Sequence, residues 1–482
     1  MPTDDQVNSY FHQFLIHIIR VLPKYIPAFE SQYPEHHPLL QHHPRRPLPH
    51  SHKTEFFPLK MCLIEEATVV GNIRVHDDIY INQLGMNPVQ LGEYAIPLFA
   101  DQLTLARTRS AQRHRRKETD VWERREVFQL GLGLFHLCMN LIWALLHTHR
   151  GTVLQPGSLN FFFSVLDKKR LGNDKPDYHT LLVTLQQIIN GLLLYAWKRQ
   201  CGHSSLGDFA NCNPSPDTLL TMAKSILNMY RPLPSNEDNN SGVDIIYQNT
   251  CRLLRDLLYV QELIHSISHG DFGRVEDLFP DLARIFRGAG SNNYCIEILH
   301  FLHAVQKVWT PGFANIMRDN MLVNVSGLPG HFMGIDMNIE HIIGELKILL
   351  ASKGVYTDWH TYRDISPAIK YLELLKKRVR YSTKCAYQKT GHTKGDFSTL
   401  VWRVASVAES YQLLEEQTER AENKVAVAFP DLLAIGHKKF ESSTLNTFNA
   451  KLKEWRDGIP AEDIKDDIPV TDFAEGSYDD ND

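Results

Sequence analysis

The chain has 482 residues, of which 43% are hydrophobic and 22% are charged, and its formal net charge at pH 7 is -5. This composition is ordinary for a globular protein with a hydrophobic core, and it excludes a collagen-like or wholly disordered chain. The negative net charge also excludes a polycation, so any contact with nucleic acid has to come from local basic patches.

The chain shows no sign of secretion or of a membrane span. Its seven cysteines are scattered without a CxxC pair, which is typical of free thiols in a reducing compartment. Asp4 and Asp5 stand where a signal peptide needs positive charge. The longest apolar stretch, residues 127–146, carries Gln129, His136 and Asn140 on one helical face, which favours a buried amphipathic helix. We therefore expect an intracellular protein without a membrane partner.

The first 59 residues divide into a helix and a segment rich in histidine and proline. Apolar residues recur at helical spacing through residues 1–30, as at Phe11, Phe14 and Ile18. Residues 33–52 contain six histidines among many prolines. Histidine invites a metal interpretation, but nothing in the sequence fixes a coordination geometry, so we expect a solvated, poorly ordered linker.

Strand signals are confined to residues 60–100. Residues 67–76 (ATVVGNIRVH) and 94–99 (YAIPLF) are short, rich in branched or aromatic residues and bounded by turn formers. Downstream, apolar periodicity predicts helices over residues 125–149, 178–199, 216–230, 243–269, 293–309, 339–352, 365–380 and 399–424. The predicted fold class is therefore mainly α with a small β-sheet in the N-terminal third. The acidic residues 461–482 predict a disordered tail.

Three acids are candidates for a metal-dependent site. Asp101 directly follows the apolar segment 94–99, so a strand would project its carboxylate from the sheet edge, where Mg²⁺ or Mn²⁺ could bind. Asp336 and Glu340 stand four residues apart and would share the first turns of one helix, with Glu340 as a second metal ligand. The alternative is that Asp101 and Asp336 are helix caps or turn residues and that Glu340 is an exposed surface acid.

A basic run follows Asp101. Eight Lys or Arg residues fall between positions 107 and 125, and the candidates for binding phosphate are Arg107, Arg109, Arg113, Arg115, Arg116 and Lys117. The pentapeptide RHRRK at 113–117 is also typical of a nuclear-import patch. The alternative is a solvated helix whose cations pair with Glu118, Asp120 and Glu123, and the sequence leaves both interpretations open.

Several long segments resemble a fungal family. The segments FADQLT (99–104), WTPGFANIMRDNMLVNVSGLPGH (309–331) and IDMNIEHIIGELK (335–347) are similar to a large family, expanded in mushroom-forming fungi and catalogued as domain of unknown function 6589. The resemblance covers residues 60–426. It implies three parts: 1–59 with the N-terminal helix and linker, 60–426 with the small sheet and helical body, and 427–482 as an extension with the acidic tail.

The resemblance also implies an origin from mobile elements. In that interpretation the acids follow the order of ribonuclease-H-like transposases, with Asp101 as the second carboxylate, a large helical insertion, and then Glu340 with Asp336 beside it. The first acid of such a site is missing, because the nearby Asp77 and Asp78 stand in the wrong order. We expect a DNA-binding remnant of a transposase that is inactive as this chain. The alternatives are a helical scaffold protein and a metal-dependent nuclease that obtains its first acid elsewhere.

Overall fold

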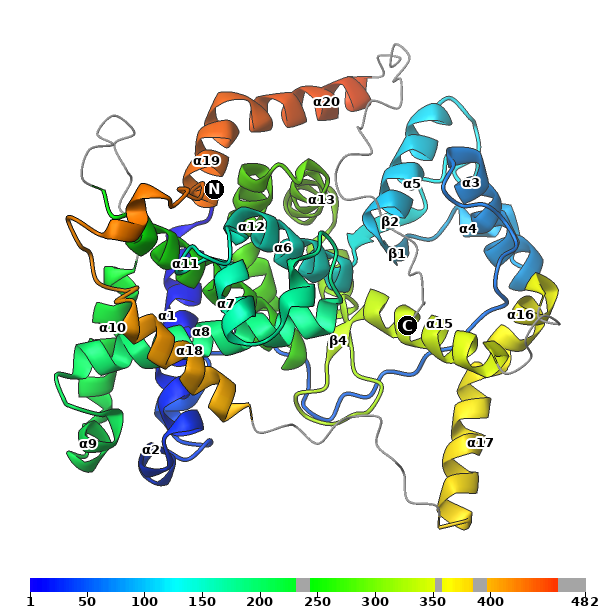
Figure 1. Ribbon diagram of the computed structural model, residues 1–482. Coiled ribbons are helices and arrows are strands. Elements are labelled where there is room, and N and C mark those ends of the chain that lie inside the picture. Colours follow the sequence, from blue (N-terminus) through cyan, green and yellow to red (C-terminus); the bar gives the residue numbers. More distant parts are fainter. Residues whose placement is uncertain (231–242, 352–357, 385–396, 458–482) are drawn as a thin grey trace.

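Helices with apolar stripes form most of the chain, as the periodicity of the sequence predicts. The computed structural model describes residues 1–230, 243–351, 358–384 and 397–457 (Figure 1). Within these residues it contains many helices, one parallel pair of strands and one short antiparallel pair. The predicted fold class, mainly α with a small sheet, is confirmed.

The helical body is built around α8, α11 and α12, whose buried residues share one hydrophobic cluster with those of α1. Phe14 of α1 and Phe279 of α12 are almost fully buried in this cluster. The N-terminal helix is therefore part of the core. The helices of the body are α1 (Asp4–Tyr25), α2 (Pro27–Gln32), α6 (Leu134–His149), α7 (Leu159–Val165), α8 (Tyr178–Cys201), α9 (Leu206–Asn211), α10 (Pro216–Met229), α11 (Ile245–Ser268), α12 (Phe272–Ala289), α13 (Asn292–His303), α14 (Pro311–Asp319), α18 (Ser398–Ser410), α19 (Leu432–Lys439) and α20 (Leu445–Asp457).

A smaller cluster surrounds the parallel strands, on the right of Figure 1. Strands β1 and β2 pair in parallel from Ile96↔Phe128 to Ala100↔Leu132, and α5 makes the crossover between them. Because parallel strands end at the same edge, the residues that follow β1 and β2 meet there. Leu91, Trp122, Val127 and Phe128 form a second hydrophobic cluster beneath this unit. Its elements are α3 (Val69–Asp77), α4 (Pro88–Leu91), β1 (Ile96–Ala100), α5 (Gln102–His114) and β2 (Phe128–Leu132).

The third group of elements leads away from the body. A two-residue antiparallel pair introduces α15, and α16 and α17 follow. In Figure 1, α17 extends beyond the rest of the molecule. The elements of this group are β3 (Leu322–Val323), β4 (Met333–Gly334), α15 (Ile335–Ala351), α16 (Trp359–Ile365) and α17 (Ile369–Ser382).

The structure corrects two secondary-structure predictions. Residues 67–76 were expected to form a strand, but they form α3, whose N-cap Thr68 accepts a hydrogen bond from the amide of Gly71. The buried face of α3 consists of Gly71, Asn72, Ile73 and His76, and this packing outweighs the strand preference of the branched residues. Residues 128–132 were expected to be helical, but they form β2. A β-carbon at Gly131 would lie 2.4 Å from the Phe99 ring, so glycine permits this close pairing.

The segment 33–52 is also not a solvated linker, although the sequence predicted one. Tyr33 and Leu40 are buried in the main cluster, and η1 (Pro38–Leu40) forms one short 3-10 turn. The amides of Arg45 and Arg46 donate to the Asp271 carboxylate at 2.9 and 2.8 Å. Side-chain acceptors thus satisfy the backbone where proline prevents a ladder. The predicted tail, residues 461–482, lies outside the described residues.

Helix α8 is the one helix of the described chain that is long and apolar enough to cross a membrane, and 72% of its most apolar window is buried within the structure. Its side chains pack in the main hydrophobic cluster, among those of α1, α11 and α18. Burial of this kind is what a core helix shows, so the length and hydropathy of α8 are weak grounds for a span.

Candidate functional site

The carboxylate of Asp101 lies at the carboxyl end of β1, as predicted, and it caps the next helix. Asp101 Oδ1 accepts a hydrogen bond from the amide of Thr104 at 2.7 Å, which makes Asp101 the N-cap of α5. The side chain is partly exposed. A carboxylate in this position also faces the positive end of the helix dipole. Asp101 is therefore a helix cap, which was the alternative to metal binding. It lies at the edge of the strand pair, where a metal ligand was expected.

Asp336 caps a helix that lies far earlier in the chain, and one of the amides that it binds is 200 residues away. Its Oδ1 accepts from the amide of Phe135 and its Oδ2 from the amide of His136, both at 3.0 Å. These are amides of the first turn of α6, which begins at Leu134 and has no side-chain cap from its own N-cap residue, Gly133. Asp336 is only 4% exposed. Both of its oxygens are thus held by amide donors, so the geometry favours a structural role for Asp336 over metal binding.

His136 links Asp336 to Glu340. Its Nδ1 is 3.1 Å from Asp336 Oδ2 and its Nε2 is 3.8 Å from Glu340 Oε1. A buried carboxylate at Nδ1 fixes the ring and its tautomer, and Nε2 is then directed toward the more exposed Glu340. Sequence reasoning treated His136 only as a polar residue on a buried helix. The sequence feature that could have identified His136 is its position just after the second strand. That strand was predicted as part of a helix, so the feature was not recognised.

Asp336 and His136 meet at one edge of the parallel pair, beside Ala100, the residue that precedes Asp101. A β-carbon at Gly133 would lie 2.4 Å from Asp336 Oδ2 and 3.1 Å from the carbonyl oxygen of Ala100, the last residue of β1. The end of β1, the start of α6 and the first turn of α15 therefore pack together. We name Asp101, His136, Asp336 and Glu340 the strand-edge cluster. It combines three carboxylates with one imidazole, groups that can hold a divalent cation or relay a proton, although two of the carboxylates cap helices.

The candidates for a missing first acid have other partners. Asp77 accepts from Arg125 Nη2 at 2.6 Å and from the Trp122 indole at 3.1 Å. Asp78 is held by both terminal nitrogens of Arg363, at 3.1 and 3.2 Å, and this guanidinium lowers the pKa of Asp78. Both acids thus anchor ion pairs away from the strand-edge cluster.

Two further acids lie near Asp101. Burial, and then the charge of Asp101, raises the pKa of Glu66. Burial also raises the pKa of Glu297, although Glu297 forms an ion pair with Arg109. Sequence reasoning missed both residues, because they come from segments that contact β1 and α5 only in the folded chain.

Most of the predicted phosphate-binding residues on and after α5 have partners within the chain. Arg109 pairs with Glu297 and Arg115 pairs with Glu123. Arg107 Nε donates to the Ala67 carbonyl at 2.8 Å, and Arg116 Nη1 donates to the Trp455 carbonyl at 2.9 Å. Lys117 is exposed and Arg113 is half-buried, and neither has a hydrogen-bond or ion-pair partner among the described residues. The basic run is therefore partly structural, and Arg113 and Lys117 remain its best candidates for contact with phosphate.

The comparisons with known proteins show the family. Residues 1–392 match the family described as Family of unknown function (DUF6589). The chain belongs to this family. No curated protein and no solved structure matches it. The DUF6589 match begins at residue 1, so it includes the N-terminal helix and the histidine-rich segment, which is consistent with their packing in the main core.

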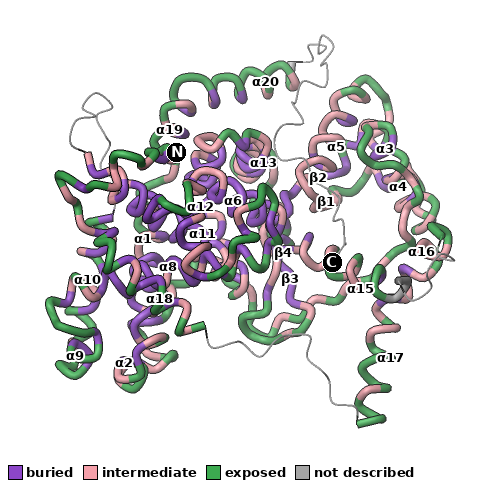
Figure 2. The backbone as a smooth tube through the Cα atoms, in the orientation of Figure 1, coloured by how far each residue is buried: buried purple, intermediate pink, exposed green. Residues whose placement is uncertain are grey.

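Helix α17 lies within the DUF6589 match and is the most exposed basic element of the described chain. Lys376, Lys377 and Arg378 are all exposed, and so is Tyr381, at 88% (Figure 2). Within α17, Ile369 is the buried residue. It is the first residue of the helix and packs against α15. Among the described residues, the ion-pair partner of Lys376 is Glu345, at 3.7 Å. The sequence predicted this helix but not its projection from the body, which depends on the packing of α15.

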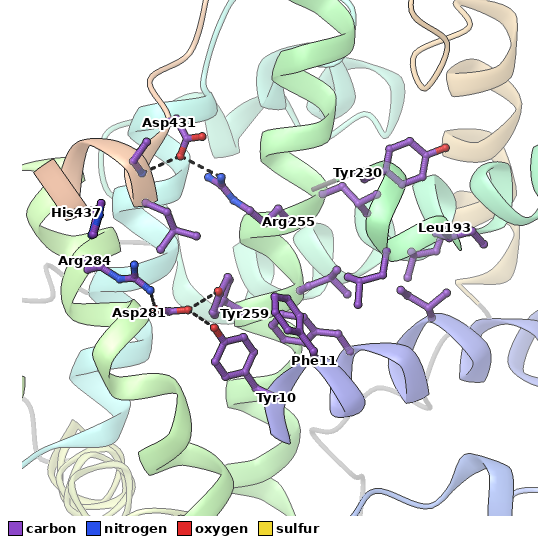
Figure 3. A pocket seen from close by; sticks show the side chains of 18 residues that line it. Tyr10, Phe11, Leu193, Tyr230, Arg255, Tyr259, Asp281, Arg284, Asp431 and His437 are labelled. Carbon is purple, nitrogen blue, oxygen red and sulfur yellow. Dashed lines mark hydrogen bonds and ion pairs between the residues drawn. The ribbon is translucent and has the colours of Figure 1, made fainter. Parts of the chain in front are cut away.

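A cavity of about 350 Å³ lies elsewhere, among α1, α8, α10, α11, α12 and α19 (Figure 3). Its charged groups neutralise one another at one end. Asp281 Oδ2 accepts from the hydroxyls of Tyr10 and Tyr259, both at 2.6 Å, and Asp281 pairs with Arg284. Phe11, Phe14, Leu193 and Ile226 also line the cavity, and the two phenylalanine rings pack against Tyr10. This cavity suits an apolar molecule rather than a phosphate, because no charge in it lacks a countercharge.

Proposed function

We propose that this chain is a nucleic-acid-binding protein derived from a ribonuclease-H-like transposase, with an incomplete catalytic site. The arrangement of the strand-edge cluster supports the derivation. Asp101 follows β1, the crossover helix and β2 come next, a long helical segment intervenes, and Asp336 of α15 then packs beside the end of β1, with Glu340 on the far side of His136. This order of acids and elements is that of ribonuclease-H-like transposases, so the support is an analogy of topology.

The observation that carries nucleic-acid binding is the exposed, basic and aromatic α17. The positive charges of Lys376, Lys377 and Arg378 are directed to solvent within three consecutive positions. Such a cluster neutralises backbone phosphates and releases counterions. Tyr381, exposed at the end of the helix, offers a ring on which a base can stack. Arg113, near the end of α5, and Lys117, just after it, are the candidates for a second contact with phosphate.

The proposed catalytic defect follows from the partners of the acids. Mg²⁺ or Mn²⁺ bound at Asp101 and Glu340 would lack the ligand of a first strand, because Asp77 and Asp78 are held by Arg125 and Arg363. Two carboxylates are fewer than a two-metal phosphoryl-transfer site requires. The proposal therefore includes weak metal binding without strand cleavage. A nuclear location is also part of it, since the residues 113–117 are typical of an import patch.

A protein-interaction scaffold is the second candidate, and exposed apolar residues favour it. Leu374, Leu375 and Val379 of α17 are 48%, 58% and 52% exposed. Apolar side chains at this density on a projecting helix fit a groove on a protein partner. The two candidates differ in their response to salt, because counterion release makes nucleic-acid binding steeply salt-dependent and apolar docking is not.

A binding measurement with a charge-matched control tests the proposal. Fluorescence anisotropy would compare the chain with the variant Lys376→Gln, Lys377→Gln, Arg378→Gln, using labelled duplex and single-stranded DNA of unrelated sequences. The control replaces three cations of α20, Lys451→Gln, Lys453→Gln and Arg456→Gln. Loss of three phosphate contacts should lower the log–log salt slope by roughly 2–3. An equal effect of both triple variants, or unchanged binding by the α17 variant, would overturn the assignment to α17.

A further inference from the structure

Three histidines from distant parts of the chain converge. His17 lies on α1, His42 lies in the segment after η1, and His265 lies on α11. One ring nitrogen of each lies within 4.8 Å of those of the other two. The ring centroids of His17 and His42 are 4.6 Å apart, and those of His42 and His265 are 4.1 Å apart. The folded chain thus provides the geometry that the histidine-rich sequence alone could not.

Two of these rings are oriented by acceptors on their outer side. His17 Nε2 is 2.8 Å from Glu262 Oε2, and His42 Nδ1 is 2.8 Å from Gln13 Oε1. Arg274 Nη2 also lies 3.1 Å from His42 Nδ1, so this guanidinium must turn away when Nδ1 donates to Gln13. When a ring N–H donates to such an acceptor, the opposite nitrogen keeps its lone pair, which is the arrangement found around metal-ligating histidines. For His42 that nitrogen is Nε2, which is buried and has no hydrogen-bond partner in the part of the chain that the structure describes.

Burial is the main cause that lowers the pKa of His17, of His42 and of His265, and at His17 the Glu262 carboxylate acts in the opposite direction. An imidazole binds a metal ion through the lone pair of its neutral form.

His265 has one contact too many for an unliganded imidazole. Its Nε2 is 2.7 Å from Arg20 Nη1 and its Nδ1 is 3.2 Å from Arg274 Nη2. A neutral imidazole has one lone pair, so it cannot accept from both guanidinium groups. In one of the two contacts, an N–H of the guanidinium must therefore point at the N–H of the imidazole. A metal ion would take the single lone pair of His265, and both guanidinium groups would then have to turn away from the ring, because its other nitrogen carries a proton.

The charges around the cluster balance. Arg274 forms two hydrogen bonds with Glu262, at 2.8 and 2.6 Å. Burial lowers the pKa of Arg20 and the Glu35 carboxylate raises it, so an acidic group acts on each of the two guanidinium groups. The ligands are nitrogens only, which selects against Mg²⁺ and Ca²⁺ and in favour of an imidazole-binding transition metal.

We propose that His17, His42 and His265 form a binding site for a zinc-type divalent metal ion, which fastens the segment 33–52 to α1 and α11. With zinc–nitrogen bonds of about 2.0–2.1 Å, tetrahedral ligands lie about 3.3–3.4 Å apart, so the rings must move closer on binding. Three protein ligands leave a fourth position for water. This inference is independent of the proposed nucleic-acid binding, because none of its residues belongs to the strand-edge cluster, α5 or α17.

Metal titration of the full chain tests the site. The chain would be stripped with a chelator, titrated with Zn²⁺ against a chromophoric competitor, and analysed for retained metal after dialysis. We expect one tightly held ion per chain and a higher unfolding temperature with zinc. His42→Ala should weaken zinc binding at least tenfold. His43→Ala is the matched control, since His43 is the neighbouring imidazole, is exposed, and stacks on His12 outside the cluster.

Circular dichroism of the metal-free variants would show whether His42→Ala keeps the fold. If it does not, Gln13→Ala provides a milder change that removes the acceptor of His42 Nδ1 and should also weaken binding. No retained zinc in the unaltered chain would overturn the proposal. Equal zinc binding by His42→Ala and His43→Ala would overturn it too, because the metal would then be held by surface histidines.

Discussion

Replacing Asp336 distinguishes a helix cap from a catalytic acid by the sign of the stability change. Asp336→Ala leaves the amides of Phe135 and His136 buried without an acceptor. Each unsatisfied buried amide costs about 1–3 kcal/mol, so we expect a loss of about 2–5 kcal/mol. Little relaxation can reduce this cost. β-carbons at Gly133 and Gly334 would lie only 2.4 and 2.7 Å from the carboxylate, so the site is tightly packed.

Asp336→Asn sharpens the test, because it keeps the shape and removes the charge. One amide oxygen can replace one carboxylate oxygen, but the NH₂ group would face a backbone N–H, so we expect a loss of about 1–3 kcal/mol. Asp101→Asn is the control. Asn and Asp are comparable N-caps, so its effect should stay within about 0.5 kcal/mol. Urea unfolding would give the stability change, and amide exchange at Phe135 and His136 would locate it.

The opposite sign would refute the capping role. A carboxylate held in a strained catalytic arrangement destabilises the fold, and its neutral variant is then equally or more stable. Asp336→Asn would then be more stable than the unaltered chain, and amide exchange at the start of α6 would not change. That result would show that the two amide contacts do not stabilise the fold and that Asp336 has a catalytic role instead.

Three further predictions concern metal, pH and packing. Asp101→Asn should abolish any gain in DNA affinity on adding Mg²⁺ or Mn²⁺, and it should leave the affinity without metal equal or tighter. If the variant responds to metal as the unaltered chain does, Asp101 is only a helix cap. Burial, and then Arg125, lowers the pKa of His76 from 6.5 to about 3, so the unfolded chain binds the proton first and stability falls as pH drops through 6.5. Between pH 6.5 and 5 this linkage lowers the free energy of unfolding by about 1.5–2 kcal/mol. The free energy of unfolding of His76→Gln should therefore fall less over this pH range than that of the unaltered chain. An equal fall in both proteins would show that His76 is protonated in the fold. Gly436→Ala should destabilise the chain by about 1–3 kcal/mol, because its β-carbon would lie 2.0 Å from the Arg284 carbonyl oxygen. Gly344→Ala is the control. Its β-carbon would enter open space on α15, so it should raise the melting temperature slightly.

Local patterns in the sequence predicted much of the fold. Helical periodicity placed α8, α10 and α11 within a few residues of their observed ends. Turn formers around residues 94–99 identified β1. The errors occurred where local preference and tertiary contact disagree. Branched residues suggested a strand at α3, and an unbroken apolar run suggested one helix across β2 and α6. Only the close approach to Phe99 requires the strand, and that contact spans about thirty residues of sequence.

The candidate site was predicted in part. Asp101 lies at a strand end and Asp336 lies in the first turn of α15, as expected. The helix that Asp336 caps could not be inferred, because its hydrogen bonds join residues 200 positions apart. The same holds for the histidines, since His42 meets His265 only after residues 33–52 fold back onto α11. Spacing along the chain carries no information about such contacts.

The central claim, binding to nucleic acid through exposed cations, is tested most directly by the salt dependence of the unaltered chain. Equilibrium anisotropy with duplex and single-stranded DNA of unrelated sequences would be followed as salt is raised. We expect binding to both, without sequence preference, and a log–log slope of about 3 or more, as four or more phosphate contacts require. Absence of binding at low salt, or an affinity that salt does not change, would contradict the claim and favour the scaffold.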